Sequence, residues 1–329
     1  MKKTNKLFFT MCMVGGFAVL FGSCKKNDET ASVAINLPAF EEEVDGRAYI
    51  DINNGNSFKW NANDQVVFYN LDNQNGNNSE KAIYQTTANA QGQASATFSY
   101  ASGDVLSAKK YGYFVFYPVE KVSANKLNEL NYETFTVSDT QEYTKLGNAS
   151  TVAPEGMAMA CDLQRLGGSF SLKHIFGVLK LKIKGTGTVT SIDVIDERFN
   201  LSGTVGMKLH EVNMNTFSSL QNTFIANDDP ENTPAFVNAW NEYRATLGYN
   251  VEEAGGKTMT LNVNNGVGLN TSTEQIFCIG LRPGALKYGF TVIVHRNGMA
   301  DYVLDYTGNN NLHYGIKAGI IKNLAVTIN

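Results

Sequence analysis

The sequence predicts an all-β protein with two sandwich-like domains in tandem. Short stretches rich in aromatic and β-branched residues recur throughout the chain after residue 48, and clusters of Asn, Gly and Asp separate them. Only one segment, Pro234–Tyr243, has the character of a helix. With 329 residues and 43% hydrophobic residues, the chain is long enough to form two packed domains.

The first 23 residues predict a lipoprotein signal peptide. Three lysines precede an apolar run, residues 7–21, which is short for a spanning helix and carries a Gly-Gly pair. Gly22 and Ser23 then precede Cys24, as a lipoprotein signal peptidase requires. Cys24 would become the first mature residue and carry acyl chains such as palmitate, because two or more chains hold a protein at a membrane far better than one. The alternative is a cleaved secretory peptide with an incidental cysteine.

Residues 24–47 form a leader with its own short strand. Val33, Ile35 and Leu37 alternate with smaller or polar residues, which places all three on one face of an extended segment. An acidic stretch follows and ends in Arg47, ahead of Ala48. We expect this stretch to be an exposed linker that a protease can reach.

The predicted N-terminal domain spans residues 48–167. Its strand candidates include residues 50–52, 65–69, 94–98 and 113–118, and Asn-rich loops lie between them at 53–56 and 72–78. Residues 164–168, which end in a Gly-Gly pair, are the expected break between the domains.

The predicted C-terminal domain spans residues 168–329. In residues 178–183 three apolar side chains alternate with Lys180 and Lys182, which is typical of an antiparallel strand with one wet face. Further strands are expected at 191–195, 259–263, 276–281, 290–295 and 302–304, with a hairpin turn at 185–187. The last strand, residues 320–328, places Leu324, Val326 and Ile328 on one face.

Composition argues against some classes of partner. Removal of residues 1–23 takes the formal net charge from −4 to −7, which disfavours binding to nucleic acid or to an anionic membrane surface. Two cysteines, Cys161 and Cys278, remain besides Cys24. Both lie in apolar strand-like stretches, so we expect buried free thiols, with a single disulfide as the alternative.

No pattern of catalytic or metal-ligating residues stands out, so the sequence predicts neither an enzyme nor a cofactor or metal site. The four histidines are far apart, and no nucleophile elbow or phosphate loop is present. His174 and His295 lie in predicted strands and are expected to be structural. Asp193, Asp196 and Glu197 could serve glycoside hydrolysis or hold calcium, but a solvated strand end is the favoured interpretation.

Several segments together resemble the fimbrillins, pilin-like lipoproteins of the Bacteroidales. The similar segments are Phe58-Lys59-Trp60 with residues 63–69, the aromatic strand at 113–118, residues 170–183, Leu201-Ser202-Gly203 and residues 318–321. Each is a loose pattern, and their order together with the lipoprotein signal carries the resemblance over nearly the whole chain.

The resemblance implies two transthyretin-like β-sandwich domains and a role in assembly at the outer membrane. Such subunits are cut after an arginine, here Arg47, lose the first strand with Val33, Ile35 and Leu37, and receive a strand from a neighbouring subunit. The C-terminal strand with Leu324, Val326 and Ile328 has the alternation of an incoming strand. The expected partners are therefore other fimbrial subunits, the outer membrane and a surface ligand on a host or bacterium.

Two other functions stay open at this point. The chain could be a monomeric surface lipoprotein that binds glycans through Trp60, Trp240 or exposed tyrosines, although Trp60 fits a core position better. A glycosidase would need two carboxyl groups facing each other across a cleft, about 5–9.5 Å apart.

Overall fold

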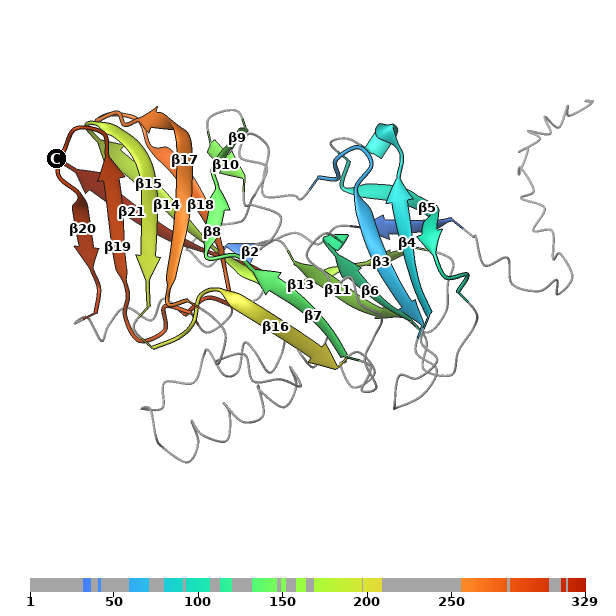
Figure 1. Ribbon diagram of the computed structural model, residues 1–329. Coiled ribbons are helices and arrows are strands. Elements are labelled where there is room, and N and C mark those ends of the chain that lie inside the picture. The colour runs from blue at the N-terminus through green and yellow to red at the C-terminus, as the bar shows by residue number, and fades with distance from the viewer. Residues whose placement is uncertain are drawn as a thin grey trace, which may run out of the picture.

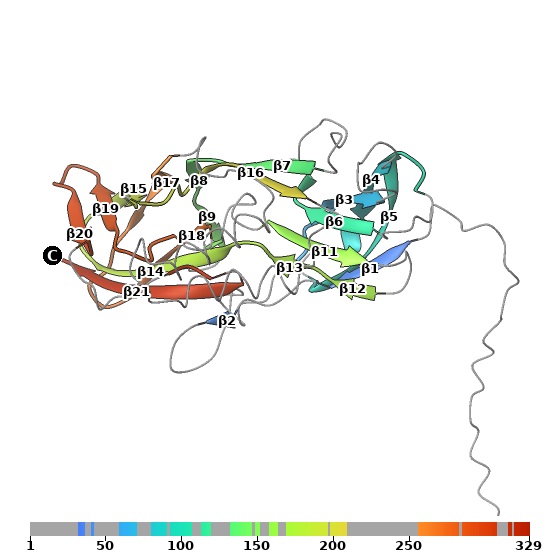
Figure 2. The same ribbon diagram turned by 90° about the horizontal axis from the view of Figure 1, so that it is seen from below.

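A computed structural model describes residues 32–36, 41–42, 59–70, 80–90, 93–106, 113–119, 132–146, 149–151, 158–163, 169–196, 198–208, 256–282, 285–307, 315–317 and 319–329. Across these ranges the chain is built almost wholly of β-strands, with one short 3-10 helix, η1 (Ala88–Ala90). The all-β prediction is confirmed. The molecule is elongated, with β1 and β3–β6 toward one end and β14, β15 and β17–β21 toward the other (Figures 1 and 2).

An eight-stranded sheet forms the end of the molecule that contains β1. Its order is β12-β1-β5-β4-β3-β6-β11-β13. The strands are β1 (Val33–Asn36), β3 (Gln65–Asn70), β4 (Glu80–Thr86), β5 (Ser95–Gly103), β6 (Tyr113–Tyr117), β11 (Met159–Leu163), β12 (Ser169–Ser171) and β13 (Lys173–His174).

This sheet curls until its two edges meet. The edge strands β12 and β13 are consecutive in the chain and are separated only by Leu172, which is fully buried. Six of these strands contribute buried residues to one core, which also contains Trp60 and Leu172, and Phe170 of β12 packs against it half-buried. The apolar runs of β3 and β6 are buried on both faces, because alternate residues such as Val67 and Phe114 belong to the second core.

Two further sheets enclose the second core at the other end. The six-stranded sheet has the order β2-β21-β14-β18-β10-β9 and the five-stranded sheet the order β20-β19-β15-β17-β8. The strands of the first are β2 (Glu41–Glu42), β9 (Thr144–Leu146), β10 (Ala149–Thr151), β14 (Gly177–Gly185), β18 (Gln275–Leu281) and β21 (Ile320–Ile328). Those of the second are β8 (Thr140–Glu142), β15 (Thr188–Ile195), β17 (Thr258–Gly268), β19 (Thr291–Arg296) and β20 (Tyr302–Asp305).

A two-stranded ribbon, β7 (Tyr132–Val137) with β16 (Gly203–Lys208), lies between the two ends (Figure 2). The sheets combine strands from both sides of residues 164–168. β12 follows these residues in the chain but pairs with β1 in the eight-stranded sheet, and β8 precedes them but pairs with β17 in the five-stranded sheet. The proposed division into domains at 167/168 stays a prediction, and it does not separate the sheets.

The turn predicted at residues 185–187 is confirmed, but it does not join a hairpin. β14 pairs with β18 and β21, whereas β15 pairs with β17 and β19, so the turn carries the chain from one sheet to the other. Gly185 and Gly187 both have positive φ there, which glycine adopts without a steric penalty. The sequence shows the turn chemistry, whereas the pairing partners depend on the rest of the fold.

The cysteines are free and buried, as expected. Cys161 lies in β11 and Cys278 in β18, so they belong to different sheets. The predicted helix at 234–243 and the expected segments at 50–52, 53–56 and 72–78 lie outside the described residues.

Candidate functional site

The leader strand β1 is an internal strand of the eight-stranded sheet. Its alternating pattern is confirmed, because Val33 is 1% exposed and Ile35 is fully buried, whereas Ala34 and Asn36 are half-buried. Because side chains alternate between the two faces of a strand, Val33 and Ile35 both lie on the core side of the sheet. Leu37, the third residue predicted on this face, lies outside the described residues.

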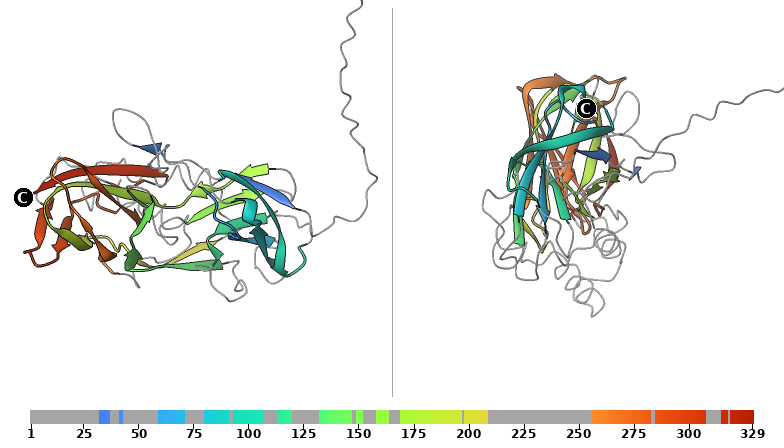
Figure 3. Two further views of the ribbon diagram at one scale, coloured as in Figure 1. Left: turned by 90° about the horizontal axis from the view of Figure 1, so that it is seen from above. Right: turned by 90° about the vertical axis from the view of Figure 1, so that its right-hand side faces the viewer.

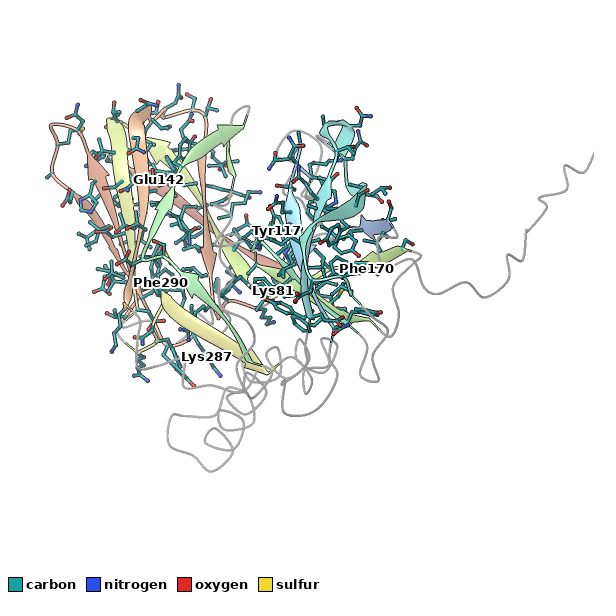
Figure 4. The ribbon with its side chains drawn as sticks, turned by 45° about the vertical axis from the view of Figure 1, so that its right-hand side comes forward. Lys81, Tyr117, Glu142, Phe170, Lys287 and Phe290 are labelled. Atoms are coloured by element: carbon teal, nitrogen blue, oxygen red, sulfur yellow. The ribbon has the colours of Figure 1, made fainter. Side chains whose placement is uncertain are left out.

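β1 is hydrogen-bonded on both sides to strands that follow the leader in the chain. It runs antiparallel to β5, with Val33 opposite Phe98 and Ile35 opposite Ala96. On its other side it runs parallel to β12, with Ile35 opposite Phe170. Figure 3 shows β1 at the end of the molecule far from the C-terminus, and Figure 4 shows Phe170 close to it. β12 has no other described strand as a neighbour.

Further contacts fasten β1 to the core. The indole Nε1 of Trp60 donates to the carbonyl oxygen of Ile35 at 3.3 Å, and the backbone N–H of Leu172 donates to the carbonyl of Asn36 at 3.2 Å. Trp60 also makes edge-to-face contacts with Phe98 and Tyr117, at centroid distances of 4.8 and 5.4 Å. Trp60 therefore packs against β1 on the core side of the sheet.

The burial of Trp60 corrects one of the functional alternatives. A tryptophan that is 1% exposed cannot stack on a sugar, so glycan binding through Trp60 is wrong. Its core role, the favoured interpretation of the sequence, is confirmed. Trp240 lies outside the described residues.

The C-terminal strand β21 is part of its own six-stranded sheet. Leu324, Val326 and Ile328 are buried, with exposed fractions of 5%, 8% and 0%, as their alternation predicts. β21 runs parallel to β14 over its length, from Val178 opposite Ile321 to Gly185 opposite Ile328. Its role as an incoming strand in a neighbouring subunit stays a prediction.

A second piece of the leader, β2, lies on the outer edge of β21. Glu41 and Glu42 pair in parallel with Ile320 and Ile321, at the start of β21. The leader therefore contacts two sheets: β1 is internal to one and β2 covers part of an edge of the other (Figure 2).

The predicted lipidation and processing residues lie outside the described residues. These are Cys24, Arg47 and Ala48. Among the described residues, no helix is long and apolar enough to cross a membrane.

No protein-family profile and no curated protein sequence matches this chain. Several solved structures do match this chain. A candidate cell adhesion protein from Bacteroides ovatus is 14% identical, with 91% of this chain and 92% of that chain aligned and a TM-score of 0.45. A candidate cell adhesion protein from Bacteroides fragilis is 12% identical over 90% and 92% of the chains, with a TM-score of 0.36. A fimbrial protein from Bacteroides ovatus is 10% identical over 91% and 50%, with a TM-score of 0.34.

All three of these structures come from Bacteroides species. We transfer no residue role from them.

Two of the three carboxylates considered near residues 193–197, Asp193 and Asp196, are described, and both make structural contacts. The expectation of a solvated strand end is wrong for Asp196. Asp196 is fully buried, and its two oxygens accept the backbone N–H groups of Arg198, Phe199 and Leu286 at 2.8–3.0 Å. Burial raises the pKa of Asp196, although these three hydrogen bonds and the charge of Lys257 oppose the shift. The carboxylate ties the turn after β15 to the loop around Leu286.

Asp193 lies half-buried beside His295 in the five-stranded sheet. It accepts a hydrogen bond from the Thr260 hydroxyl at 2.6 Å and lies 3.1 Å from Nε2 of His295. The other ring nitrogen of His295 lies 2.9 Å from Asp301. Burial alone would lower the pKa of His295, but the hydrogen bonds and charges of the two aspartates raise it overall. His295 is therefore a structural residue, as expected.

No group of three or more His, Cys, Asp or Glu side chains within the described ranges is arranged to hold a metal ion. Glu197 lies outside these ranges.

Sequence reasoning missed the residues that hold β1 in place. Trp60, Ala96 and Phe170 come from three distant segments, and their meeting at β1 depends on the curling of the sheet. The alternation of residues 169–172 is the one local signal of β12.

Proposed function

We propose that this protein is a structural, adhesive subunit of a surface fibre, a fimbrium, and that it assembles by exchange of strands between subunits. One observation carries the proposal: a strand supplied by the leader is internal to a sheet whose other strands all follow the leader. A cut between Arg47 and Ala48 would separate β1 from the rest of the chain without breaking any other described strand.

The proposal includes export as a lipoprotein and anchoring at the outer membrane surface through Cys24. The charged start, the short apolar run and the small residues before Cys24 support this step. The leader would then connect the lipid to the folded chain until cleavage.

Loss of β1 would open an apolar groove between β5 and β12. The pockets of Val33 and Ile35 would be empty, and the Trp60 indole and the Leu172 N–H would each lose a carbonyl partner. Each large apolar side chain contributes about 1.5–3 kcal/mol on burial, so refilling two pockets supplies about 3–6 kcal/mol before backbone pairing is counted. Unpaired strand edges flanking an apolar groove are the usual acceptor for an added strand.

The incoming strand in the proposal is β21 of a neighbouring subunit. β21 is already paired in its own sheet, so its apolar side chains are buried both before and after donation to a neighbouring subunit. Leu324, Val326 and Ile328 would leave one core and enter another, so the strand alone contributes little net free energy. The proposal therefore requires further contacts between neighbouring subunits beside the strand.

Cleavage would also affect β21 directly. The loss of β2 would uncover the edge of β21 at Ile320 and Ile321, leaving β14 as its one described neighbour strand. The same cut would thus open the groove and loosen the start of the proposed donor strand.

Limited digestion with trypsin tests the groove. The chain from Lys25 onward and its Arg47→Gln variant are treated in parallel, and the new N-terminus and the molecular size are followed together. We expect the native chain to be cut after Arg47 and to form oligomers, and the variant to stay monomeric. A native chain that is cut after Arg47, loses residues 25–47 and remains a compact monomer would overturn the proposal.

A competition experiment tests the donor strand without risking the fold. A synthetic peptide of residues 320–329 is added during cleavage, and a control peptide carries serine at positions 324, 326 and 328. We expect the first peptide to shorten the oligomers and the control to have no effect. Oligomers of equal length with both peptides, or polymerisation of a chain truncated after Lys322, would exclude β21 as the donor.

A further inference from the structure

A hollow of about 400 Å³ lies where β17 ends, between that strand, the residue after β8 and the start of β18. Its lining residues include Tyr143, the three amide residues Asn264, Asn265 and Gln275, and Gly266. This volume is within the range of small-molecule sites in proteins, about 300–1,000 Å³. None of the residues that line the hollow is charged.

A bulge in β17 brings the amides to the hollow. Val189 of β15 pairs with Val267 and Ser191 pairs with Asn262, so residues 263–266 of β17 face the single residue Thr190. Extra residues in one strand bend it and turn its side chains away from the regular alternation. Asn264 and Asn265 are both exposed, instead of alternating between the two faces.

Gly266 is needed for this bulge. Its φ is +64°, and a Cβ at this position would lie 2.6 Å from Cγ2 of Thr188. A side chain at this position would meet both the unfavourable φ and the Thr188 methyl group, so glycine fits the bulge best.

Glu142 fixes the orientation of one lining amide. Its carboxylate accepts hydrogen bonds from Nδ2 of Asn262 at 3.0 Å and from Nδ2 of Asn264 at 2.6 Å. With its nitrogen held in this way, Asn264 has its oxygen left as an acceptor. Glu142 is the last residue of β8, the edge strand of the five-stranded sheet, and is labelled in Figure 4. The side chains of Asn265 and Gln275 make no hydrogen bond to another described residue.

Tyr143 is the aromatic residue of the lining. Its ring packs against Phe277 at a centroid distance of 5.5 Å, which holds it in place. Burial, and secondarily the neighbouring Cys278, raise the pKa of Tyr143, so its hydroxyl stays protonated at neutral pH.

We propose that this hollow binds a neutral saccharide unit. Amides both donate and accept, as sugar hydroxyls do, and an aromatic ring offers a flat apolar face to the C–H groups of a pyranose. The Glu142 carboxylate contacts the lining residue Asn264, and no lysine or arginine belongs to the lining. The nearby Glu274 is paired with Lys184 at 3.9 Å, so Glu142 is the charge that disfavours an anionic sugar such as sialic acid.

This inference is independent of strand exchange, because every residue of the hollow lies outside the leader and outside β21. A subunit that fails to polymerise can still bind a sugar here, and a polymer can form from subunits that do not.

A glycan microarray tests the inference. The chain from Lys25 onward is applied to immobilised mannose, galactose, fucose and N-acetylglucosamine glycans and to sialylated ones, and each hit is titrated with the free sugar by calorimetry. Asn265→Ala and Gln275→Ala remove one amide each, and Asn89→Ala removes an exposed amide in η1 as a matched control. Thermal unfolding of all variants checks that the fold is retained.

We expect binding to neutral glycans that weakens about three- to tenfold in each of the two pocket variants, as the loss of one hydrogen bond predicts, and is unchanged in Asn89→Ala. No binding to any neutral glycan on the array would overturn the proposal. Equal binding by folded pocket variants would exclude this hollow as the site, and a preference for sialylated glycans would overturn the neutral class.

Discussion

The substitution Ile35→Ala tests whether the leader strand is an integral part of the fold. Ile35 is fully buried between Ala96 of β5 and Phe170 of β12, both fixed by strand pairing. Loss of three carbons forfeits about 2.4 kcal/mol of transfer free energy at about 0.8 kcal/mol per group. Because the flanking strands cannot collapse into the space, a cavity term adds to this loss. We expect the free energy of unfolding to fall by about 3–4 kcal/mol in total.

Urea unfolding followed by tryptophan fluorescence measures this loss. The chain has two tryptophans, so a Trp240→Phe background leaves Trp60, which contacts the backbone of Ile35, as the one reporter. Val303→Ala is the matched control: Val303 is a β-branched residue in β20 that is 56% exposed, and its truncation should change stability by no more than about 0.5 kcal/mol.

The same substitution has a second, sharper consequence. After a cut at Arg47 and loss of the leader, the native chain and the Ile35→Ala variant yield identical products, so their unfolding curves should coincide. A loss below about 1 kcal/mol in the uncut chain would refute the assignment of β1 as a core strand. A difference that persists after cleavage would show that β1 remains bound.

Three other substitutions test separate parts of the fold. Gln141→Ala should cost about 2–4 kcal/mol in urea unfolding, because the buried amide donates to the carbonyl of Gly280 at 2.7 Å and accepts its N–H at 3.0 Å, and both groups would lose their partner. The pKa of His295 is raised above its ordinary value of about 6.5, so the stabilisation from its two aspartates is fully present below that pH and lost as pH rises through the raised pKa. A His295→Gln variant should lack this decline when Tm is measured from pH 5 to 9, and an unchanged profile would contradict the pairing. Gly185→Ala should weaken the end of β21, because the new Cβ would lie 2.0 Å from the carbonyl oxygen of Ile328 and because residue 185 has a φ of +147°. Faster hydrogen exchange at the last residues of β21 would show this effect.

The sequence predicts the strands well where the signal is local. Alternation identifies both the burial of Val33 and Ile35 and that of the C-terminal strand, because the two-residue period depends only on the residues themselves. The predicted strands at 65–69, 113–118 and 178–183 correspond to β3, β6 and β14 in the same way.

Pairing and register depend on distant residues and could not be read from the sequence. The run Tyr113–Tyr117 indicates a strand, but its full burial on both faces reflects a second core behind the sheet. In β17 the predicted strand stops at Val263, directly before Asn264-Asn265-Gly266. The structure continues the strand through a bulge at these residues, since β15 pairs with β17 on both sides of it.

The position of the leader also gives a reason why, in the proposed assembly by strand exchange, an uncut subunit would stay a monomer. A strand tethered to the chain has an effective concentration of about millimolar or more, so β1 outcompetes the β21 strand of a free neighbour for the same groove. Cleavage at Arg47 removes the tether. β1 can then dissociate, and its return becomes a second-order event in competition with neighbouring subunits. The groove and the loosened start of β21 would become available together, because β1 and β2 leave on the same piece of chain. Proteolysis, and not folding, would therefore set the time at which subunits assemble.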